Sequence, residues 1–431
     1  MTKELDLRDP DAICATLGLA GAPDIWRSTW ARSVGGFVAG DLFFLKPAYV
    51  RETCAFLRIG PELSEKLAES AESVASDVGL QRLAWHLHWL ASLSGIDAGV
   101  GQWPPLAPEA HPANALLYGL VVLAGVPRLL EINRARGIAD EITIETLSDL
   151  ETWATDYLNW GGVYRLQSLG WIQHHLRGNL FKIVRLEYIP GQYGHPFRWY
   201  RNDTNGQVVA LAEDGLLLRP DGQFASADRG EVREGLWKTR LVEALESVTG
   251  SPVAPEGRVL GDTVTLDTNE WREVLRKGDP VMTVHIPSKG SMRPEDCGES
   301  FRQAIEFYQR HFPEVVFRAF TCTSWLLDPQ FEQFQPAPPN ICGFLKEWYL
   351  HPVEGADDSQ AFQRMFDLFG PYGQVRWGEV EGKSSLQRAA LEFVAQGGHP
   401  RSGGSVLFGE DLDWGKAVYR NERRLDVIQW G

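Results

Sequence analysis

A histidine at the end of an apolar run is well placed for chemistry. His285 closes the apolar part of residues 281–286, and a turn containing Pro, Ser, Lys and Gly follows at once. An imidazole has an ordinary pKa of about 6.5, so it can take a proton from an amine or a hydroxyl at neutral pH. The position predicts a general base. The alternative is a buried histidine hydrogen-bonded to the backbone.

A second apolar run, 315–327, contains a thiol and a hydroxyl two residues apart, Cys322 and Ser324. Side chains alternate along a strand, so these two share a face. A thiolate beside His285 would be a nucleophile able to carry an acyl group. A small cysteine packed in the core is the alternative, since free cysteines are usually buried.

The turn between these runs contains Ser288, Lys289, Gly290 and Ser291. The lysine and the hydroxyls suit a diphosphate or a carboxylate, and Gly290 lets a ligand approach the backbone closely. We expect an anion-binding loop here, with a solvated surface turn as the alternative.

Further candidates lie outside this unit. Arg185, Glu187 and Tyr188 belong to one short strand-like segment, where Glu187 is a second candidate base and the other two are candidate substrate contacts. A cross-strand ion pair between Arg185 and a neighbour is the alternative. Trp325 is a candidate wall of an acyl channel, and Asn340 is a candidate substrate contact or helix cap.

Composition excludes several classes of protein. The 431 residues carry 57 acidic and 42 basic side chains, a net charge of −15, which is the reverse of a general nucleic-acid binder. The five cysteines form no CxxC, the first residues lack an apolar signal core, and the apolar run 115–126 is shorter than the roughly 20 residues that span a bilayer. We expect a cytoplasmic protein without membrane contact. No HExxH or Cys/His cluster predicts a metal site.

The elements that position these residues fall into three parts. Residues 1–160 read as helices, with one helix interrupted near Pro127 and another over 143–158. Residues 161–276 read as an antiparallel meander that also contains helices at 231–248 and 269–276. Residues 277–431 hold a strand, a loop, a helix opened by Pro294 and a second strand, the order that a parallel crossover needs. The predicted fold class is α+β with a mixed sheet.

Four blocks, residues 162–193, 284–314, 321–331 and 384–407, together resemble a bacterial family of acyltransferases. That family pairs an N-acyltransferase N-terminal region with a C-terminal domain similar to the GCN5-related N-acetyltransferases. The resemblance implies that 281–286 is the central strand, 288–291 the phosphate loop and 294–311 the following helix. It also implies that the acyl-thioester arm lies in a gap between 281–286 and its neighbour, 315–324. The loop departs from the usual Q/R-x-x-G-x-G/A pattern, since only Gly290 fits.

The resemblance implies an enzyme that moves an acyl group from acyl-CoA or an acyl carrier protein to an amine or hydroxyl of a small molecule. Acyl-CoA would then be a co-substrate, and we expect no tightly bound cofactor. Two alternatives stay open at this point. One is a hydrolase or covalent acyltransferase that uses Cys322 and His285. The other is a binding module without catalysis, favoured by the acidic Glu295 and Asp296 at the start of the helix.

Overall fold

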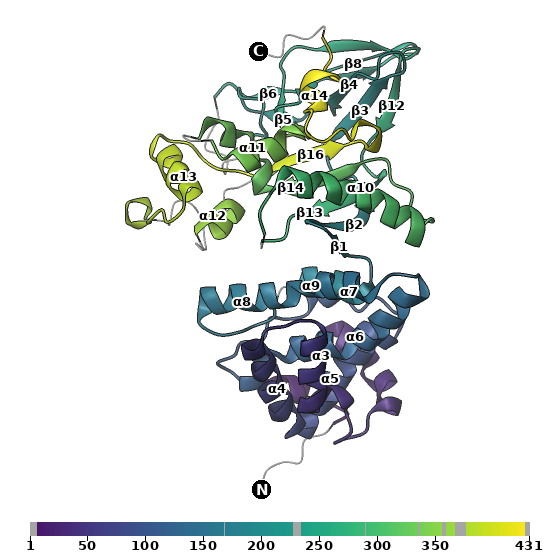
Figure 1. Ribbon diagram of the computed structural model, residues 1–431, viewed down its shortest axis with the longest axis vertical. Helices are drawn as coiled ribbons and strands as arrows, with labels where there is room; N and C mark the ends of the chain where they lie inside the picture. The colour runs from purple at the N-terminus through teal and green to yellow at the C-terminus, as the bar shows by residue number, and fades with distance from the viewer. Residues whose placement is uncertain are drawn as a thin grey trace. The chain divides into compact units, whose positions relative to one another are not determined.

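The computed structural model describes residues 7–167, 169–226, 234–288, 290–334, 337–355, 359–366 and 376–426. The chain forms two compact units, Met1–Lys182 and Ile183–Gly431 (Figure 1). The first is helical and the second is rich in strands, so the α+β class is confirmed. The division at 160 and 276 stays a prediction. None of the described helices is long and apolar enough to cross a membrane.

The first unit is built around a buried helix, α6. Its α-helices are α1 (Pro10–Thr16), α2 (Asp24–Thr29), α3 (Pro47–Phe56), α4 (Pro61–Ala75), α5 (Val78–His88), α6 (Leu117–Ala135), α7 (Asp140–Leu147), α8 (Asp149–Gly161) and α9 (Leu169–Arg177). Prolines at the first position open α1, α3 and α4. The single helix expected over 143–158 is instead α7 and α8, which meet at Ser148.

The interruption expected near Pro127 is wrong, because α6 runs through this proline. A proline inside a helix removes one backbone donor and leaves the carbonyl four residues earlier without its partner. That carbonyl belongs to Leu123, and the Tyr49 hydroxyl of α3 donates to it at 2.9 Å. A side chain from a neighbouring helix therefore replaces the lost bond.

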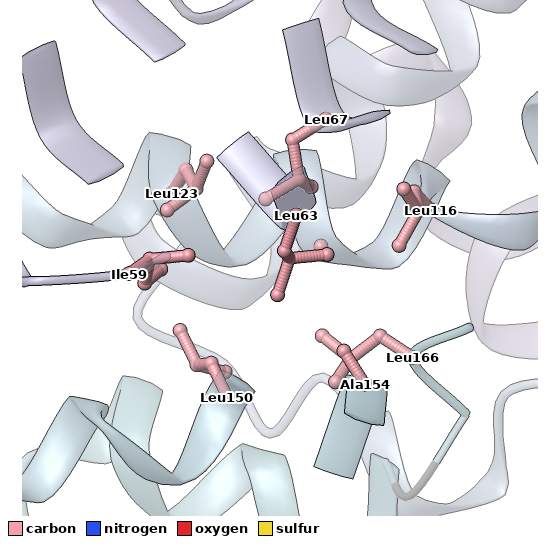
Figure 2. A pocket seen from close by; sticks show the side chains of 9 residues that line it. Ile59, Leu63, Leu67, Leu116, Leu123, Leu150, Ala154 and Leu166 are labelled. Atoms are coloured by element: carbon pink, nitrogen blue, oxygen red, sulfur yellow. The ribbon is translucent and has the colours of Figure 1, made fainter. Parts of the chain in front are cut away.

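Helices α4, α6 and α8 leave a small apolar void between them, lined largely by leucines (Figure 2). Its volume is about 20 Å³. A single water needs roughly 10–15 Å³ on the same measure, so the void cannot hold an acyl chain. The helical unit therefore shows a packed core here rather than a ligand pocket.

The second unit is organised by a mixed sheet with the strand order β1-β2-β13-β14-β16-β15. Its strands are β1 (Phe181–Ile183), β2 (Leu186–Gln192), β13 (Pro280–His285), β14 (Phe320–Ser324), β15 (Tyr349–His351) and β16 (Gly403–Leu407). β13 and β14 run parallel and are joined through α10 (Pro294–His311), which confirms the predicted strand–helix–strand unit. The second strand starts at Phe320, later than the sequence suggested.

The remaining strands form antiparallel sheets. The order β10-β9-β4-β3-β12 makes one and β11-β8-β7 another, with β5 and β6 as a separate pair. Their bounds are β3 (Phe197–Asn202), β4 (Val208–Ala212), β5 (Leu217–Leu218), β6 (Trp237–Lys238), β7 (Leu241–Glu243), β8 (Ser247–Gly250), β9 (Pro252–Ala254), β10 (Arg258–Val259), β11 (Val264–Asp267) and β12 (Trp271–Leu275). These strands overturn both helices expected within the meander.

Tertiary pairing explains this error. The segment 269–276 has a helix-like spacing of apolar residues, but β12 pairs with β3, Trp271 opposite Asn202. The described part of 231–248 holds β6 and β7 and the start of β8, while residues 227–233 lie outside the described part. Local propensity is a weak prior that such pairing overrides.

Helix α10 covers one face of the mixed sheet (Figure 1). The fully buried Ser300 hydroxyl on α10 donates to the Ile183 carbonyl and accepts from the Leu186 amide, 3.2 Å away. The Tyr188 hydroxyl lies 2.8 Å from the same oxygen. One serine therefore fixes β1 and β2 to the helix.

The last third of the chain adds short helices around this sheet: α11 (Pro339–Lys346), α12 (Ser359–Phe366), α13 (Ser385–Ala395) and α14 (Val418–Asn421). No role is predicted from the sequence for residues 409–431. Here Asp411, 4% exposed, accepts from Arg201 on β3 at 2.9 Å. Arg423 also contacts Asp411, at 3.3 Å. The described part of this segment is therefore anchored to the antiparallel sheet by a buried ion pair.

Arg201→Met should destabilise the protein by about 3 kcal/mol, because a buried carboxylate loses its main partner. The remaining contact with Arg423 keeps the loss at the lower end of the range for such pairs. Urea unfolding measures the change. Arg272→Met is the matched control, since this exposed arginine pairs with an exposed Asp203 and should change stability by less than about 0.5 kcal/mol. Equal losses in both variants would contradict the assignment.

Candidate active site

The register of the mixed sheet places two titratable side chains next to each other. His285 on β13 lies opposite Glu187 on β2 in the antiparallel ladder. Directly opposed residues project to the same face, so the imidazole and the carboxylate are neighbours. His285 is half-buried, whereas Glu187 is only 2% exposed. Both residues are predicted from the sequence as candidate bases, but no sequence signal predicts that they are neighbours.

The parallel ladder between β13 and β14 is short. Within the described residues it contains only Met282 opposite Phe320 and Thr283 opposite Thr321. The strands carry on to His285 and Ser324, so they part after Thr283 and Thr321, before either strand ends. Backbone groups that no longer pair across the strands can then meet a ligand, as the resemblance implies for a thioester arm.

On the far side of this parting, the face that carries His285 continues as Thr323, Gly404 and His351. Gly404 on β16 pairs with Thr323 on one side and with His351 on the other. Alternation puts Thr323 on the same face as Thr321, and therefore on the same face as Thr283 and His285. The sheet thus presents a row of polar residues across its strands.

A further histidine lies over this row. His195, from the segment between β2 and β3, has its Nε2 atom 3.1 Å from the Thr323 hydroxyl. Its ring lies 4.4 Å from that of His351. Burial, together with the positive charge of Lys277, lowers the pKa of His195 to about 4. At neutral pH this imidazole is uncharged and can accept a proton.

The partner ring is locked by its surroundings. His351 is 0% exposed, and its Nδ1 atom lies 2.9 Å from the Pro352 carbonyl, which can only accept. The Nδ1 atom therefore carries the proton and the ring is neutral. Burial and the neighbouring His195 hold the pKa of His351 well below its usual range. A Cβ atom on Gly404 would lie 2.2 Å from this ring, so only glycine leaves room for it.

The opposite face is closed by α10. Tyr188 lies there, fully buried, with its hydroxyl on Ser300, and it is a structural residue in this arrangement. Cys322 shares that side because it is one residue out of phase with Thr321 and Thr323. Burial raises the pKa of the Cys322 thiol to about 12. The register therefore does not bring Cys322 and His285 together.

Three other predicted residues occupy the surroundings of β14 and α11. Ser324 uses its hydroxyl to accept from the Leu326 amide at 3.2 Å, which caps a short 3-10 turn. Trp325 is half-buried and its ring contacts Phe331. Asn340 is exposed inside α11, whose N-cap is Pro338, so the capping alternative for Asn340 is wrong. Their roles as ligands stay predictions.

The predicted anion loop follows β13, and Lys289 lies outside the described residues. Ser288, Gly290 and Ser291 are described, and Gly290 has φ +99°, a conformation that favours glycine. The Arg185 guanidinium donates to backbone carbonyls of this loop. The expected cross-strand ion pair of Arg185 does not occur among the described residues, and Arg185 contacts the loop rather than the polar row.

One of the two acidic residues at the start of α10, Asp296, forms an ion pair, as does Glu299 further along the helix. Asp296 accepts from Arg293 at 2.7 Å, and Glu299 accepts from Arg302 at 2.9 Å. These pairs reduce the negative charge that the helix start presents to an anion. Among the described residues, no group of three His, Cys, Asp or Glu side chains could hold a metal ion.

Sequence reasoning missed His195, Thr323 and His351. Both histidines precede a proline, in His195-Pro196 and His351-Pro352, and a residue before proline favours an extended backbone. That signal predicts an extended histidine but not a meeting of two segments 156 positions apart. Only the sheet order reveals that they share a site.

A parallel strand pair that parts behind a crossover helix, with polar groups at the opening, is the arrangement of an acyltransferase-type fold. The family model of the GNAT-like C-terminal domain matches residues 180–407, more than half of the chain. The family model of the N-acyltransferase N-terminal domain matches residues 48–178. The chain belongs to the family with the GNAT-like C-terminal domain. Comparison with curated proteins finds no match.

Solved acyltransferase structures share this fold. One, in complex with decanoyl-CoA and teicoplanin, is 21% identical, with a TM-score of 0.61 over 93% of this chain and 99% of the other. Another, in complex with CoA and 10C-teicoplanin, is 22% identical with a TM-score of 0.62 and the same coverage. A mutant acyltransferase in complex with octanoyl-CoA is 20% identical, with a TM-score of 0.60. The likeness spans both units of the chain.

Cys322 in the native protein should resist iodoacetamide at pH 8, because the thiol is buried and its pKa is about 12. Peptide mapping by mass spectrometry after brief alkylation measures this. The unfolded protein is the control and should be labelled at all five cysteines. Fast labelling of native Cys322 that a substrate prevents would instead support a covalent mechanism.

Proposed function

We propose that this protein transfers an acyl group from acyl-CoA to an amine or hydroxyl of a small-molecule acceptor. The observation that carries the proposal is the parting of β13 and β14 beside two histidines, His285 and His195. The family and the fold of acyltransferases solved with acyl-CoA support it. An acyl carrier protein is the other donor expected from the sequence.

The donor would lie along the parting strands. Its thioester would occupy the gap beyond Thr283 and Thr321, where backbone groups are released from the ladder. Its diphosphate would meet the loop of Ser288, Lys289, Gly290 and Ser291 ahead of α10, since a helix start attracts anions. The similar structures hold decanoyl-CoA, CoA or octanoyl-CoA, which supports a donor of this class.

The chemistry proposed is direct attack on the thioester. The acceptor nitrogen or oxygen bonds to the carbonyl carbon, the C–S bond breaks, and a neutral imidazole takes the proton that the acceptor loses. That proton then reaches the leaving sulfur, so that CoA departs as a thiol. His285, beside Glu187, and His195, beside Thr323, are the candidate bases on the two sides of the gap. Trp325 and Asn340 remain candidate contacts for the substrates.

The proposal also covers the acceptor and the location of the protein. Teicoplanin in two similar structures supports a small-molecule acceptor. All five cysteines are free and buried, which supports a cytoplasmic location. The net charge of −15 supports a protein that acts without nucleic acid.

Decanoyl-CoA should bind the purified protein and raise its melting temperature by several degrees at a hundred times its Kd, because such binding stabilises by about 2.7 kcal/mol. Differential scanning fluorimetry measures the shift, and decanoic acid without the CoA moiety is the control. No shift with any acyl-CoA of short, medium or long chain would refute the proposed donor.

Removing the base should lower turnover about 10²–10⁴-fold while donor binding persists. His195→Gln and His285→Gln separate the two candidates, and His311→Gln, on the last turn of α10, is the matched control. Turnover is measured with an aromatic amine, which stays uncharged below pH 7. Full turnover in both variants would exclude both histidines as the base and leave Glu187 as the candidate to be tested.

The same variants allow a direct check of protonation. A histidine with a folded pKa near 4 binds no proton as the pH falls from 7 to 5 and becomes charged only below that interval. Nitrogen-15 spectra of the histidine rings should therefore show one signal, absent from His195→Gln, that does not move above pH 5. A midpoint near 6.5 for that signal would contradict the burial described here.

A further inference from the structure

The loop after β13 is held in shape by one side chain from another strand pair. Arg185, in the turn between β1 and β2, donates from Nη2 to the carbonyl oxygens of Pro287 and Gly290, at 3.0 and 3.1 Å. Its Nε atom donates to the Ser291 carbonyl at 3.0 Å. A single guanidinium thus fixes three carbonyls of a short loop.

The turn that presents Arg185 is itself unusual. Val184 has φ +56°, which is rare for a β-branched residue. This conformation is strained and persists only where the surroundings enforce it. The next residue, Arg185, is only 8% exposed, so its guanidinium reaches the loop from underneath rather than from solvent.

Peptide geometry then fixes the direction of the loop amides. In a planar trans peptide the C=O and the following N–H point in opposite directions. Carbonyls of Pro287, Gly290 and Ser291 that face Arg185 therefore turn the N–H groups of Ser288, Ser291 and Met292 away from it. None of these three amides donates a hydrogen bond to any residue in the described part of the chain. The consecutive free amides of Ser291 and Met292 are of the kind that form a concavity for an anion.

The guanidinium also brings a positive charge, which the carboxylates of Glu187 and Asp296 influence without a direct ion pair. Its Nη1 atom is buried, and no acceptor among the described residues lies within hydrogen-bond distance. The described residues give Arg185 no ion pair with a carboxylate, and an arginine side chain keeps its charge in proteins. A fixed positive charge therefore lies beneath the outward-facing amides, and α10 begins a few residues further on.

We propose that Arg185 is a positioning residue that shapes the described part of the loop after β13, residues 288 and 290–292, into a cradle for the diphosphate of CoA. The inference rests on the proposed function, since it concerns how the same donor is held. Glycine-rich loops adopt such shapes through their own backbone freedom. This loop has one glycine, Gly290, and the guanidinium supplies the remaining constraint.

The test compares two ligands that differ in the diphosphate. Calorimetry gives Kd for decanoyl-CoA and for decanoyl-pantetheine, which lacks that group. Arg185→Met should weaken decanoyl-CoA binding about 10- to 100-fold, the size of a lost charge-assisted contact, and leave decanoyl-pantetheine unchanged. Arg185→Lys should also weaken decanoyl-CoA, because an ammonium keeps the charge but cannot hold three carbonyls in one plane. Arg302→Met, an exposed arginine of α10, is the control and should bind both ligands as the wild type does.

An unchanged Kd for decanoyl-CoA in Arg185→Met would overturn the inference, and so would wild-type affinity in Arg185→Lys, which would reduce the role to charge alone. If both Arg185 variants unfold, Gly290→Ala tests the same loop from within, since φ +99° is strained for alanine. It should weaken decanoyl-CoA and spare decanoyl-pantetheine, and unchanged binding of both would again overturn the inference. A wild type that binds neither ligand would instead refute the proposed function.

Discussion

The whole second unit is arranged around a parallel strand pair that lasts for only two residue pairs. Met282 and Thr283 pair with Phe320 and Thr321, and then the strands part. Before that point α10 packs against one face of the sheet through Ser300, Phe301 and Tyr308. Beyond it, backbone groups and the polar row are available to a ligand. A longer ladder would close the gap.

Much of this arrangement follows from local sequence signals. The strand ending at His285, the turn containing Gly290 and the helix opened by Pro294 are each encoded within a few residues, so the sequence predicted them. The helix expected over 269–276 failed because its apolar spacing suits either state, and pairing with β3 decided the outcome. Whether a segment is a helix or a strand can thus be predicted where local sequence signals determine it, and not where pairing with another segment does.

The same distinction between local signals and tertiary pairing applies to the site residues. His285 and Glu187 were recognised by type and position, yet their opposition depends on the register between β2 and β13. Cys322 was also recognised by type, as a candidate nucleophile, but alternation turns it toward α10, where burial raises the pKa of its thiol. The meeting of His195 with Thr323 and His351 depends on strand order, which no local pattern contains. Candidate reactive residues can be predicted from a sequence, but the face of the sheet on which each side chain lies is known only from the fold.

The packing of the His351 ring against Gly404 can be used to recognise related sites in other sequences. The His351 ring occupies the space that any side chain at position 404 would need, so the two positions cannot change independently. A related chain with alanine or a larger residue there must move or replace the buried ring, and the neighbour of His195 changes with it. The pair of residues at 351 and 404 therefore indicates, from sequence alone, which relatives can build the same histidine environment and which need a different one.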